Sequence, residues 1–235
     1  MASAGLYRWQ YYPLKSKTWR GVMKQKKNRK LLWIILGIAL TIFLSLGAIG
    51  GIKYMNYQKE QEAKITREHK LYKRGFRLLE EQIALYTKEH YEGVREIGFS
   101  PIFEDGGGGY RMYTLKMVPV IYDHHGNRAI LGGEIGNDFY KYYGLGSELT
   151  LDFDGDDNEI IELKKLDTGE VVDLSKAQHL PDKAKVNTYS ALDENIEALV
   201  KDGQLQGVKK SDKGSPKAKV VYNTEIRRGD YTKWR

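Results

Sequence analysis

The sequence has 235 residues, contains no cysteine and carries a formal net charge of +7 at pH 7. Without cysteine the chain can form no disulfide, carry no lipid on a thiol and use no thiolate nucleophile. The positive charge lies at one end. Residues 1–30 contain nine Lys or Arg and no acidic residue, whereas residues 31–235 contain 29 Lys or Arg against 31 Asp or Glu. The basic composition therefore gives no indication of nucleic-acid binding, which we do not expect.

Residues 31–52 form an apolar run of 22 residues without a charge. As a helix this run is about 33 Å long, enough to cross a hydrocarbon layer of about 30 Å. It lacks the polar stripe of a helix on a soluble domain, so we expect a single transmembrane helix. The basic flank predicts a cell-membrane protein with a cytoplasmic N-terminus and an extracytoplasmic location for residues 53–235.

Two alternatives concern the same apolar run. A cleaved signal peptide is less favoured, because its apolar part usually has only about 7–15 residues. Gly47 and Gly51 have the spacing that lets two membrane helices approach closely, which would allow a homodimer. Ordinary glycine usage in a membrane helix is the favoured interpretation of that pair.

A second helical pattern begins after the apolar run and continues to about Tyr91. This stretch has no proline, and its apolar and aromatic residues recur at steps of three and four from Ile65 onward. Gly75 is expected to kink the helix or to divide a polar stalk from a packed helix. We therefore divide the chain into a basic cytoplasmic tail (1–30), a transmembrane helix (31–52), a stalk helix (53–75) and an extracytoplasmic α+β domain (76–235).

Strand patterns dominate the rest of the chain, which predicts an α+β fold with the helix packed on a mostly antiparallel sheet. Residues 94–105 resemble an irregular or edge strand, and residues 110–123 a long strand in which Pro119 suggests a bulge or an edge. Residues 128–136 predict a further strand, and residues 148–153 and 159–166 a hairpin. One more helix is expected near residue 190, with Ser190 as its N-cap and Asp193 at the third helical position. Residues 203–210 and 217–228 are expected to pair with each other.

Aromatic residues are concentrated in the segment "DFYKYYG". Phe139, Tyr140, Tyr142 and Tyr143 lie within five residues, and the segment is expected to be a connection with a short helical turn. Tyrosine joins a large apolar ring to a polar tip and is enriched where proteins meet partners. A simple strand or helix cannot bury all four rings on one face, so we predict that these residues bind a protein partner.

The densest acidic cluster is a weak calcium candidate formed by Asp152, Asp154, Asp156 and Asp157. No register of the segment "LDFDGDDNEIIEL" places both the glycine and the glutamate that an EF-hand requires. A solvated hairpin turn is the favoured interpretation. The adjacent His124 and His125 are likewise not favoured as metal ligands, since no closed set of three or four ligands is visible.

No nucleophile–base–acid motif of a known hydrolase class is present, so we expect a binding protein and not an enzyme. No cofactor is expected apart from the weak calcium candidate. A sensor is disfavoured because residues 1–30 are too few for a folded effector domain.

Residues 80–123 resemble part of the small membrane-anchored envelope proteins of Gram-positive bacteria. The shared order is a helix ending in Tyr-x-x-x-x-Tyr-x-Gly-Val, an Ile-x-Phe strand, a turn and a second long strand. Some of these proteins are encoded beside type VII secreted LXG toxins as immunity or accessory proteins. The resemblance implies a non-catalytic binder that occludes a toxin at the outer leaflet. The alternative is a structural or accessory subunit of an envelope secretion or conjugation apparatus.

Overall fold

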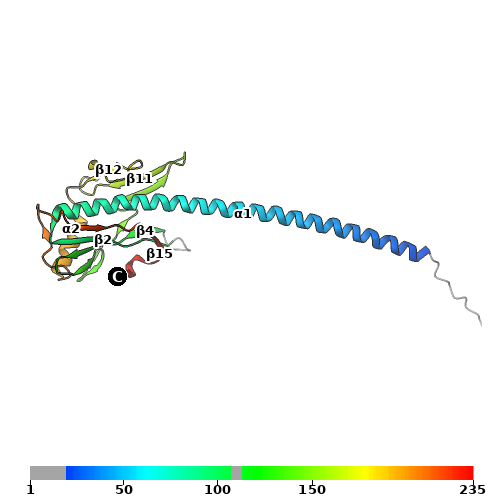
Figure 1. The fold of residues 1–235 in the computed structure, drawn as a ribbon, viewed down its shortest axis with the longest axis horizontal. Helices are drawn as coiled ribbons and strands as arrows, with labels where there is room; N and C mark the ends of the chain where they lie inside the picture. The colour runs from blue at the N-terminus through cyan, green and yellow to red at the C-terminus, as the bar shows by residue number, and fades with distance from the viewer. Residues whose placement is uncertain (1–19, 107–112, 235) are drawn as a thin grey trace, which may run out of the picture. The chain divides into compact units, whose positions relative to one another are not determined.

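The computed structural model describes residues 20–106 and 113–234. The chain divides into two compact units, Met1–Glu62 and Ala63–Arg235. Its secondary structure is α+β, with one long helix at the start of the described chain and many short strands after it (Figure 1). Helix α1 (Arg20–His90) contributes to both units, which are described one at a time.

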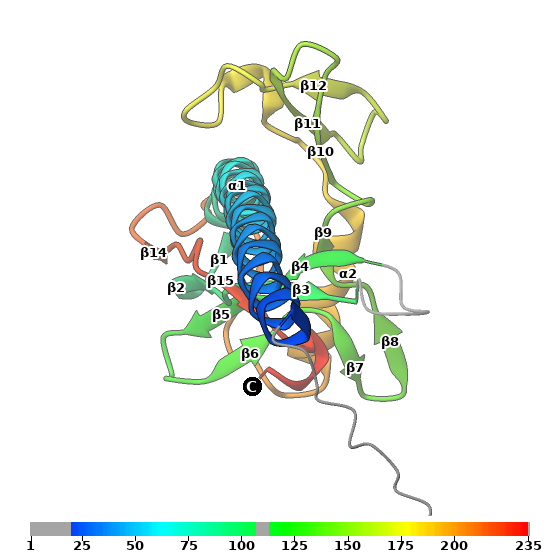
Figure 2. The same ribbon diagram turned by 90° about the vertical axis from the view of Figure 1, so that its right-hand side faces the viewer.

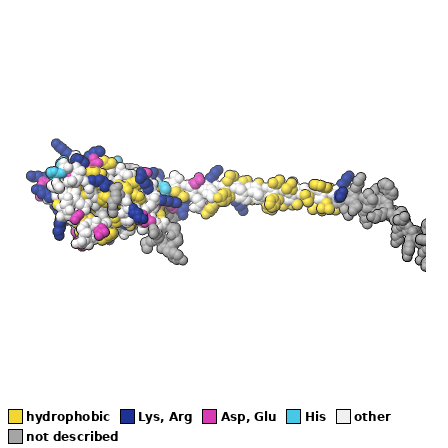
Figure 3. All heavy atoms as spheres, turned by 90° about the horizontal axis from the view of Figure 1, so that it is seen from below, with side chains coloured by type: hydrophobic (Ala, Val, Ile, Leu, Met, Phe, Trp, Pro, Cys, Tyr) yellow, Lys and Arg dark blue, Asp and Glu magenta, His cyan; other side chains and the backbone are white. Residues whose placement is uncertain are grey.

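In the first unit, the apolar segment of α1 is exposed along its whole length. All side chains of residues 31–52 are exposed, with Phe43 at 75%. Hydrophobic side chains cover this length of the helix (Figure 3). By length and composition the segment is able to cross a membrane. An apolar surface on all sides of a helix is typical of a membrane span and costs free energy in water.

The second unit begins inside the segment expected as a stalk. Leu71 of α1 is already buried, and the helix continues through Gly75 to His90. A Cβ atom on Gly75 would lie 2.3 Å from Cδ2 of Leu151, so the glycine lets a strand come close to the helix. Gly75 therefore marks a helix–strand contact inside the packed part of α1 and not the end of a stalk.

Strands form three larger sheets and two strand pairs in the second unit. The first four-stranded sheet has the order β14 (Lys219–Val221), β2 (Val94–Phe99), β5 (Pro119–Asp123), β6 (Arg128–Ile130). The second has the order β15 (Ile226–Arg228), β3 (Ile102–Asp105), β4 (Thr114–Met117), β9 (Tyr143–Gly144). The three-stranded sheet contains β10 (Leu149–Phe153), β11 (Glu159–Lys164) and β12 (Val171–Asp173). The two pairs join β1 (Tyr91–Glu92) to β13 (Lys209–Lys210) and β7 (Gly133–Ile135) to β8 (Asp138–Tyr140).

The C-terminal part of α1 lies between sheets. Figures 1 and 2 show the three-stranded sheet on one side of this part of the helix and the four-stranded sheets on the other. The helix is accordingly buried on more than one face: Phe76, Leu79, Ile83 and Tyr86 of the predicted stripe are buried, and so is Leu78 outside it. One core cluster includes residues of α1 and of all three larger sheets.

The irregular or edge strand predicted at residues 94–105 and the long strand predicted at residues 110–123 are each divided into two, at facing positions. The breaks fall at Ser100–Pro101, between β2 and β3, and at Val118, between β4 and β5. Proline has no N–H to donate, and Ser100 instead accepts a hydrogen bond on Oγ from the Val118 amide at 2.8 Å. Pro119 is the first residue of β5, a position that proline tolerates, and not a bulge.

The C-terminal strands do not pair with each other as expected. β13 pairs with β1, β14 pairs in parallel with β2, and β15 pairs in parallel with β3. The sheets are therefore mixed, and the expectation of a local hairpin after Gly203 was wrong. Each of these strands finds an edge formed more than 100 residues earlier, which no local pattern reveals.

The hairpin predicted around the acidic turn is confirmed by the antiparallel pairing of β10 with β11, in which Leu151 faces Ile161.

The helix predicted near residue 190 is α2 (Ser190–Lys201), with Leu192, Ile196 and Leu199 buried. Ser190 is not its N-cap. Tyr189 holds that position without a capping side-chain bond, and Asp193 is bonded elsewhere. Two short 3-10 helices, η1 (Asp182–Ala184) and η2 (Tyr231–Lys233), complete the described chain.

Candidate partner-binding surface

The aromatic segment forms part of a glycine-framed hairpin. Residues 128–136, predicted as one strand, are divided into β6 and β7 at Gly132, whose φ is 88°. A Cβ atom there would lie 2.9 Å from the Lys141 carbonyl oxygen, so a side chain would be strained and crowded. Gly136 (φ 61°) and Asn137 make the two-residue turn between β7 and β8, with glycine at the first central position as a type II′ turn requires.

The four predicted partner-binding residues do not form one surface. Tyr143 belongs to β9 and is fully buried, so its ring is part of the core and cannot contact a partner. Its hydroxyl accepts a hydrogen bond from Asn195 Nδ2 at 2.9 Å. Burial raises the pKa of Tyr143 well above its ordinary value. The expected helical turn is absent, because residues 138–140 and 143–144 are strands of different sheets.

Phe139 is the exposed member of the run. Its side chain is 74% exposed, while that of Tyr142 is only 9% exposed and Tyr140 is half-buried. The Tyr142 ring meets the edge of Phe139 at 6.1 Å between centroids and that of Tyr231 at 4.8 Å. Edge-to-face contacts of this kind are favourable, so Tyr142 supports Phe139 from below. Phe139 is therefore an exposed aromatic ring beside the hairpin turn, and its position is stabilised by contact with Tyr142.

A groove separates this hairpin from α2. It consists of two adjoining depressions of about 570 and 340 Å³, which share Asp138, Tyr140 and Glu194. Its α2 wall is a continuous helical stripe that ends at the residue after the helix: Ala191, Glu194, Asn195, Glu197, Ala198, Lys201 and Asp202. Its other wall is the hairpin from Ile135 to Lys141. We call this feature the hairpin groove.

The hairpin groove is acidic. In the described part of the chain its lining contains four acids, Asp138, Glu194, Glu197 and Asp202, and two cations, Lys201 and Lys141. Lys141 is already paired with the buried Glu148 at 2.6 Å. The side-chain carboxylates of Asp138, Glu194 and Glu197 have no ion pair and accept no hydrogen bond among the described residues. Three solvated carboxylates therefore face a space that also contains aromatic side chains.

Hydrogen bonds hold both walls of the groove in place. On the α2 side, Asp193 accepts hydrogen bonds from Tyr91 at 2.6 Å, from Tyr86 at 3.0 Å and from Lys210 at 2.6 Å. Asn195 accepts from the Gly132 amide at 3.0 Å, which ties the helix to the start of the hairpin. Walls fixed in this way lose little conformational freedom when a partner binds.

The acidic turn predicted as a weak calcium candidate is stabilised by its own hydrogen bonds. Asp154 Oδ1 accepts from the amides of Asp156 and Asn158, and Asp154 Oδ2 accepts from the Asn158 side chain. Asp157 has φ 66° and pairs with Arg67 at 3.1 Å. Asp152 accepts from the amide of Phe153. In the described parts of the chain, no group of three or more acidic or histidine side chains is placed to hold a metal ion.

A larger groove of about 1260 Å³ lies between α1 and the three-stranded sheet. Its helix wall is basic, with Arg67 and Lys70, and its sheet wall is mainly acidic, with Asp157, Glu159 and Glu162 among its residues. One ion pair is formed across the space, between Arg67 and Asp157 at 3.1 Å. This groove shows no preference for one class of ligand.

The sequence predicts the aromatic side of this candidate surface but not its acidic side. Glu194 and Glu197 lie opposite the apolar face of a predicted helix, where charged residues are usually only solvated. The signal that could have drawn attention to them is three acids against one lysine between Asp193 and Lys201. That Glu194 lines the same depression as Phe139 depends on tertiary structure.

No protein-family model, no characterised protein and no solved structure matches this chain.

Proposed function

We propose that this chain is a membrane-anchored extracytoplasmic protein-binding module whose partner surface is the hairpin groove with Phe139. The observation that supports this most directly is the exposed Phe139 ring, supported by Tyr142 and set beside a preformed concave surface. Exposed aromatic anchors next to pockets are typical of residues that dominate the binding energy of protein interfaces. The groove offers carboxylates and aromatic rings, which suit contact with a protein.

The proposed anchor is the apolar segment 31–52, with the nine basic residues before it on the cytoplasmic side. Under this topology residues 53–235 lie outside the cell, in a single-pass arrangement. Confinement to a surface raises the effective concentration of a binder toward any target that must reach the same membrane. This advantage supports a role as an immunity protein that neutralises a secreted toxin, as the resemblance of residues 80–123 implies.

A structural or accessory subunit of an envelope secretion or conjugation apparatus is the second candidate. It is favoured by Gly47 and Gly51, which have the spacing at which two membrane helices can approach closely. Such a subunit would assemble through α1, whereas an immunity protein would depend on the hairpin groove.

Site-specific photocrosslinking in cells tests the proposal. A photoreactive amino acid at Asn137, in the exposed hairpin turn, should give one discrete adduct with a protein partner. Phe139→Ala should remove the adduct, whereas Val171→Ala, which truncates another exposed hydrophobic side chain on β12, should leave it unchanged. An adduct that survives Phe139→Ala, or the lack of any adduct, would contradict the proposed surface.

A further inference from the structure

We infer that the hairpin groove takes a short basic segment of a protein partner, with an arginine or lysine among the α2 carboxylates and an apolar side chain against Phe139. This inference rests on the proposed function and specifies the chemistry of the partner. It commits to a cationic peptide segment as the occupant.

Charge complementarity favours a positively charged side chain in the segment that occupies the groove. Of the four acids that line the groove, Asp138, Glu194 and Glu197 have no partner among the described residues, and Lys201 is the only cation there without a buried partner. An acidic segment would be repelled by these carboxylates. A neutral segment would remove water from them without supplying a positive charge in return. An arginine can bond a carboxylate through two N–H groups, and so gains more than a neutral side chain of the same size.

The apolar part of the occupant follows from Phe139. A ring that is 74% exposed loses unfavourable contact with water when an apolar side chain covers it. An arginine placed over the ring face would gain a cation–π contact as well. Phe139 and Glu194 line the same depression, so one segment can reach both.

The length of the groove limits the size of the segment. Its α2 wall extends from Ala191 to Asp202, which is about 17 Å at 1.5 Å per helical residue. An extended peptide covers that distance with about five residues. The larger groove beside α1 is less suited to a cationic segment, because three of its lining residues, Arg67, Lys70 and Lys176, are themselves cations.

Peptide binding to the full-length chain tests the inference. The chain is held in nanodiscs of zwitterionic phosphatidylcholine, so that the lipid itself does not attract a basic peptide. Three fluorescent octapeptides serve as probes: one with alternating arginine and phenylalanine, one with glutamine for arginine, and one with glutamate for arginine. Fluorescence anisotropy should show that the arginine peptide binds about tenfold or more tightly than the glutamine peptide, and the glutamate peptide least.

Charge-matched variants separate the groove from general attraction. Glu194→Lys with Glu197→Lys should weaken the arginine peptide about tenfold or more and abolish the preference for it. Asp156→Lys with Asp212→Lys changes the net charge equally at two exposed positions outside the groove and should keep both affinity and preference. Phe139→Ala should weaken the arginine and glutamine peptides alike.

Three results would overturn the inference: equal affinity for the arginine and glutamine peptides, equal losses in the two double variants, or no binding of any peptide. The proposed function is judged separately by the adduct formed at Asn137. An adduct that depends on Phe139, together with no arginine preference, would keep the function and reject the basic partner. A preference for the arginine peptide without any adduct in cells would support the basic partner and reject the proposed function.

Discussion

Glu80 and Asp123 are two fully buried carboxylates with opposite surroundings. Burial raises the pKa of Glu80 to about 8. Among the residues that the structure describes, its carboxyl group accepts a hydrogen bond from the Asn223 amide alone, at 3.2 Å. Burial alone would also raise the pKa of Asp123. Hydrogen bonds from the amides of Gln206, Asn127 and His125 and from the Asn127 side chain instead lower it to about 2. The number of hydrogen-bond donors thus decides whether each carboxyl group is protonated or ionised in the folded chain.

Glu80→Gln should stabilise the second unit at alkaline pH. Because the pKa of Glu80 in the folded chain is about 8 and its ordinary value is 4.5, the folded state binds more protons between these values. The free energy of unfolding therefore falls as pH rises through that window. Glutamine keeps an acceptor for Asn223 and cannot ionise. In urea unfolding at pH 8.5, we expect the free energy of unfolding of the variant to be higher than that of the wild type by on the order of 2 kcal/mol. At pH 4.5 the two free energies should differ little.

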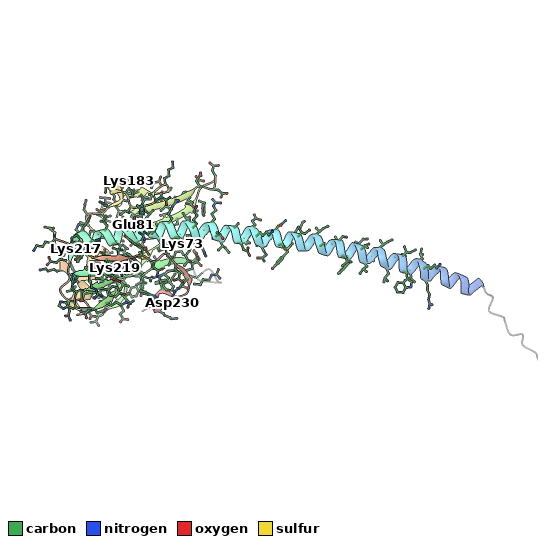
Figure 4. The ribbon with its side chains drawn as sticks, in the orientation of Figure 1. Lys73, Glu81, Lys183, Lys217, Lys219 and Asp230 are labelled. Atoms are coloured by element: carbon green, nitrogen blue, oxygen red, sulfur yellow. The ribbon has the colours of Figure 1, made fainter. Side chains whose placement is uncertain are left out.

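The neighbouring Glu81 provides the control (Figure 4). Its carboxylate accepts from the Leu180 amide at 2.7 Å and pairs with Arg77 at 2.9 Å. Burial opposes ionisation of Glu81, but these partners lower its pKa, so Glu81→Gln should destabilise the unit at neutral pH. Identical pH profiles for Glu80→Gln and the wild type would contradict the assignment of Glu80.

Asp123→Asn should destabilise the second unit at neutral pH. The carboxylate accepts four hydrogen bonds, at 2.7 to 2.9 Å, within the 123–127 turn and from Gln206. An amide would point two N–H groups at donors, which costs roughly 2–3 kcal/mol in chemical unfolding. Because the pKa in the folded chain lies near 2, below the ordinary 3.8, this stabilisation is present above pH 3.8 and is lost as pH falls toward 2. His125→Ala, which keeps its backbone donor, should leave this acid dependence in place.

At the scale of elements, the contact between α1 and β10 depends on one glycine. Gly75→Ala adds a methyl group that meets Leu151, whereas alanine alone would favour the helix by about 1 kcal/mol. We expect the crowding to outweigh the helix preference in the wild-type background. In a Leu151→Ala background the same substitution should become stabilising. A double-mutant cycle from thermal unfolding measures this sign change, and additive effects would show that the two residues do not meet.

Helix α2 is held by Asp193 and not by an N-cap serine. Asp193→Ala leaves Tyr86, Tyr91 and Lys210 without their acceptor and should cost roughly 2–3 kcal/mol in the free energy of unfolding. Ser190→Ala removes a side chain without a capping bond and should change stability by less than about 0.5 kcal/mol. Should Ser190→Ala cost as much as about 1 kcal/mol, the capping box predicted from the sequence would be restored.

Local signals predicted the elements well where the chain folds locally. Alternating residues around Asp154–Asn158 predict the β10–β11 hairpin, and apolar spacing predicts α2. The division of two strands at Ser100 and Val118 and the parallel pairing of β14 and β15 depend on contacts between distant segments. The same limit applies to the site. The aromatic run was visible, but the burial of Tyr143 and the position of Glu194 beside Phe139 come from tertiary packing.

For the whole molecule, the proposed topology places the part of α1 that follows the apolar segment within reach of external protease. Residues 53–60 are exposed throughout. A site-specific protease sequence inserted after Lys59 should be cut when protease is added to intact cells, releasing the second unit in soluble form. The same sequence placed within residues 1–19 should stay uncut until the membrane is permeabilised. The reverse pattern on immunoblots would refute the orientation.

The parallel strands β14 and β15 also determine how late in synthesis the two four-stranded sheets can be completed. Each occupies an outer edge of a sheet whose inner strands, β2 and β3, are synthesised more than 100 residues earlier. The first of these sheets is not complete until residue 221 has been synthesised, and the second not until residue 228. A nascent or prematurely terminated chain therefore presents two bare strand edges, which are prone to aggregate and suited to recognition by chaperones and proteases. Folding of the second unit is consequently a late event, which is compatible with the proposed translocation of this unit across the membrane in extended form.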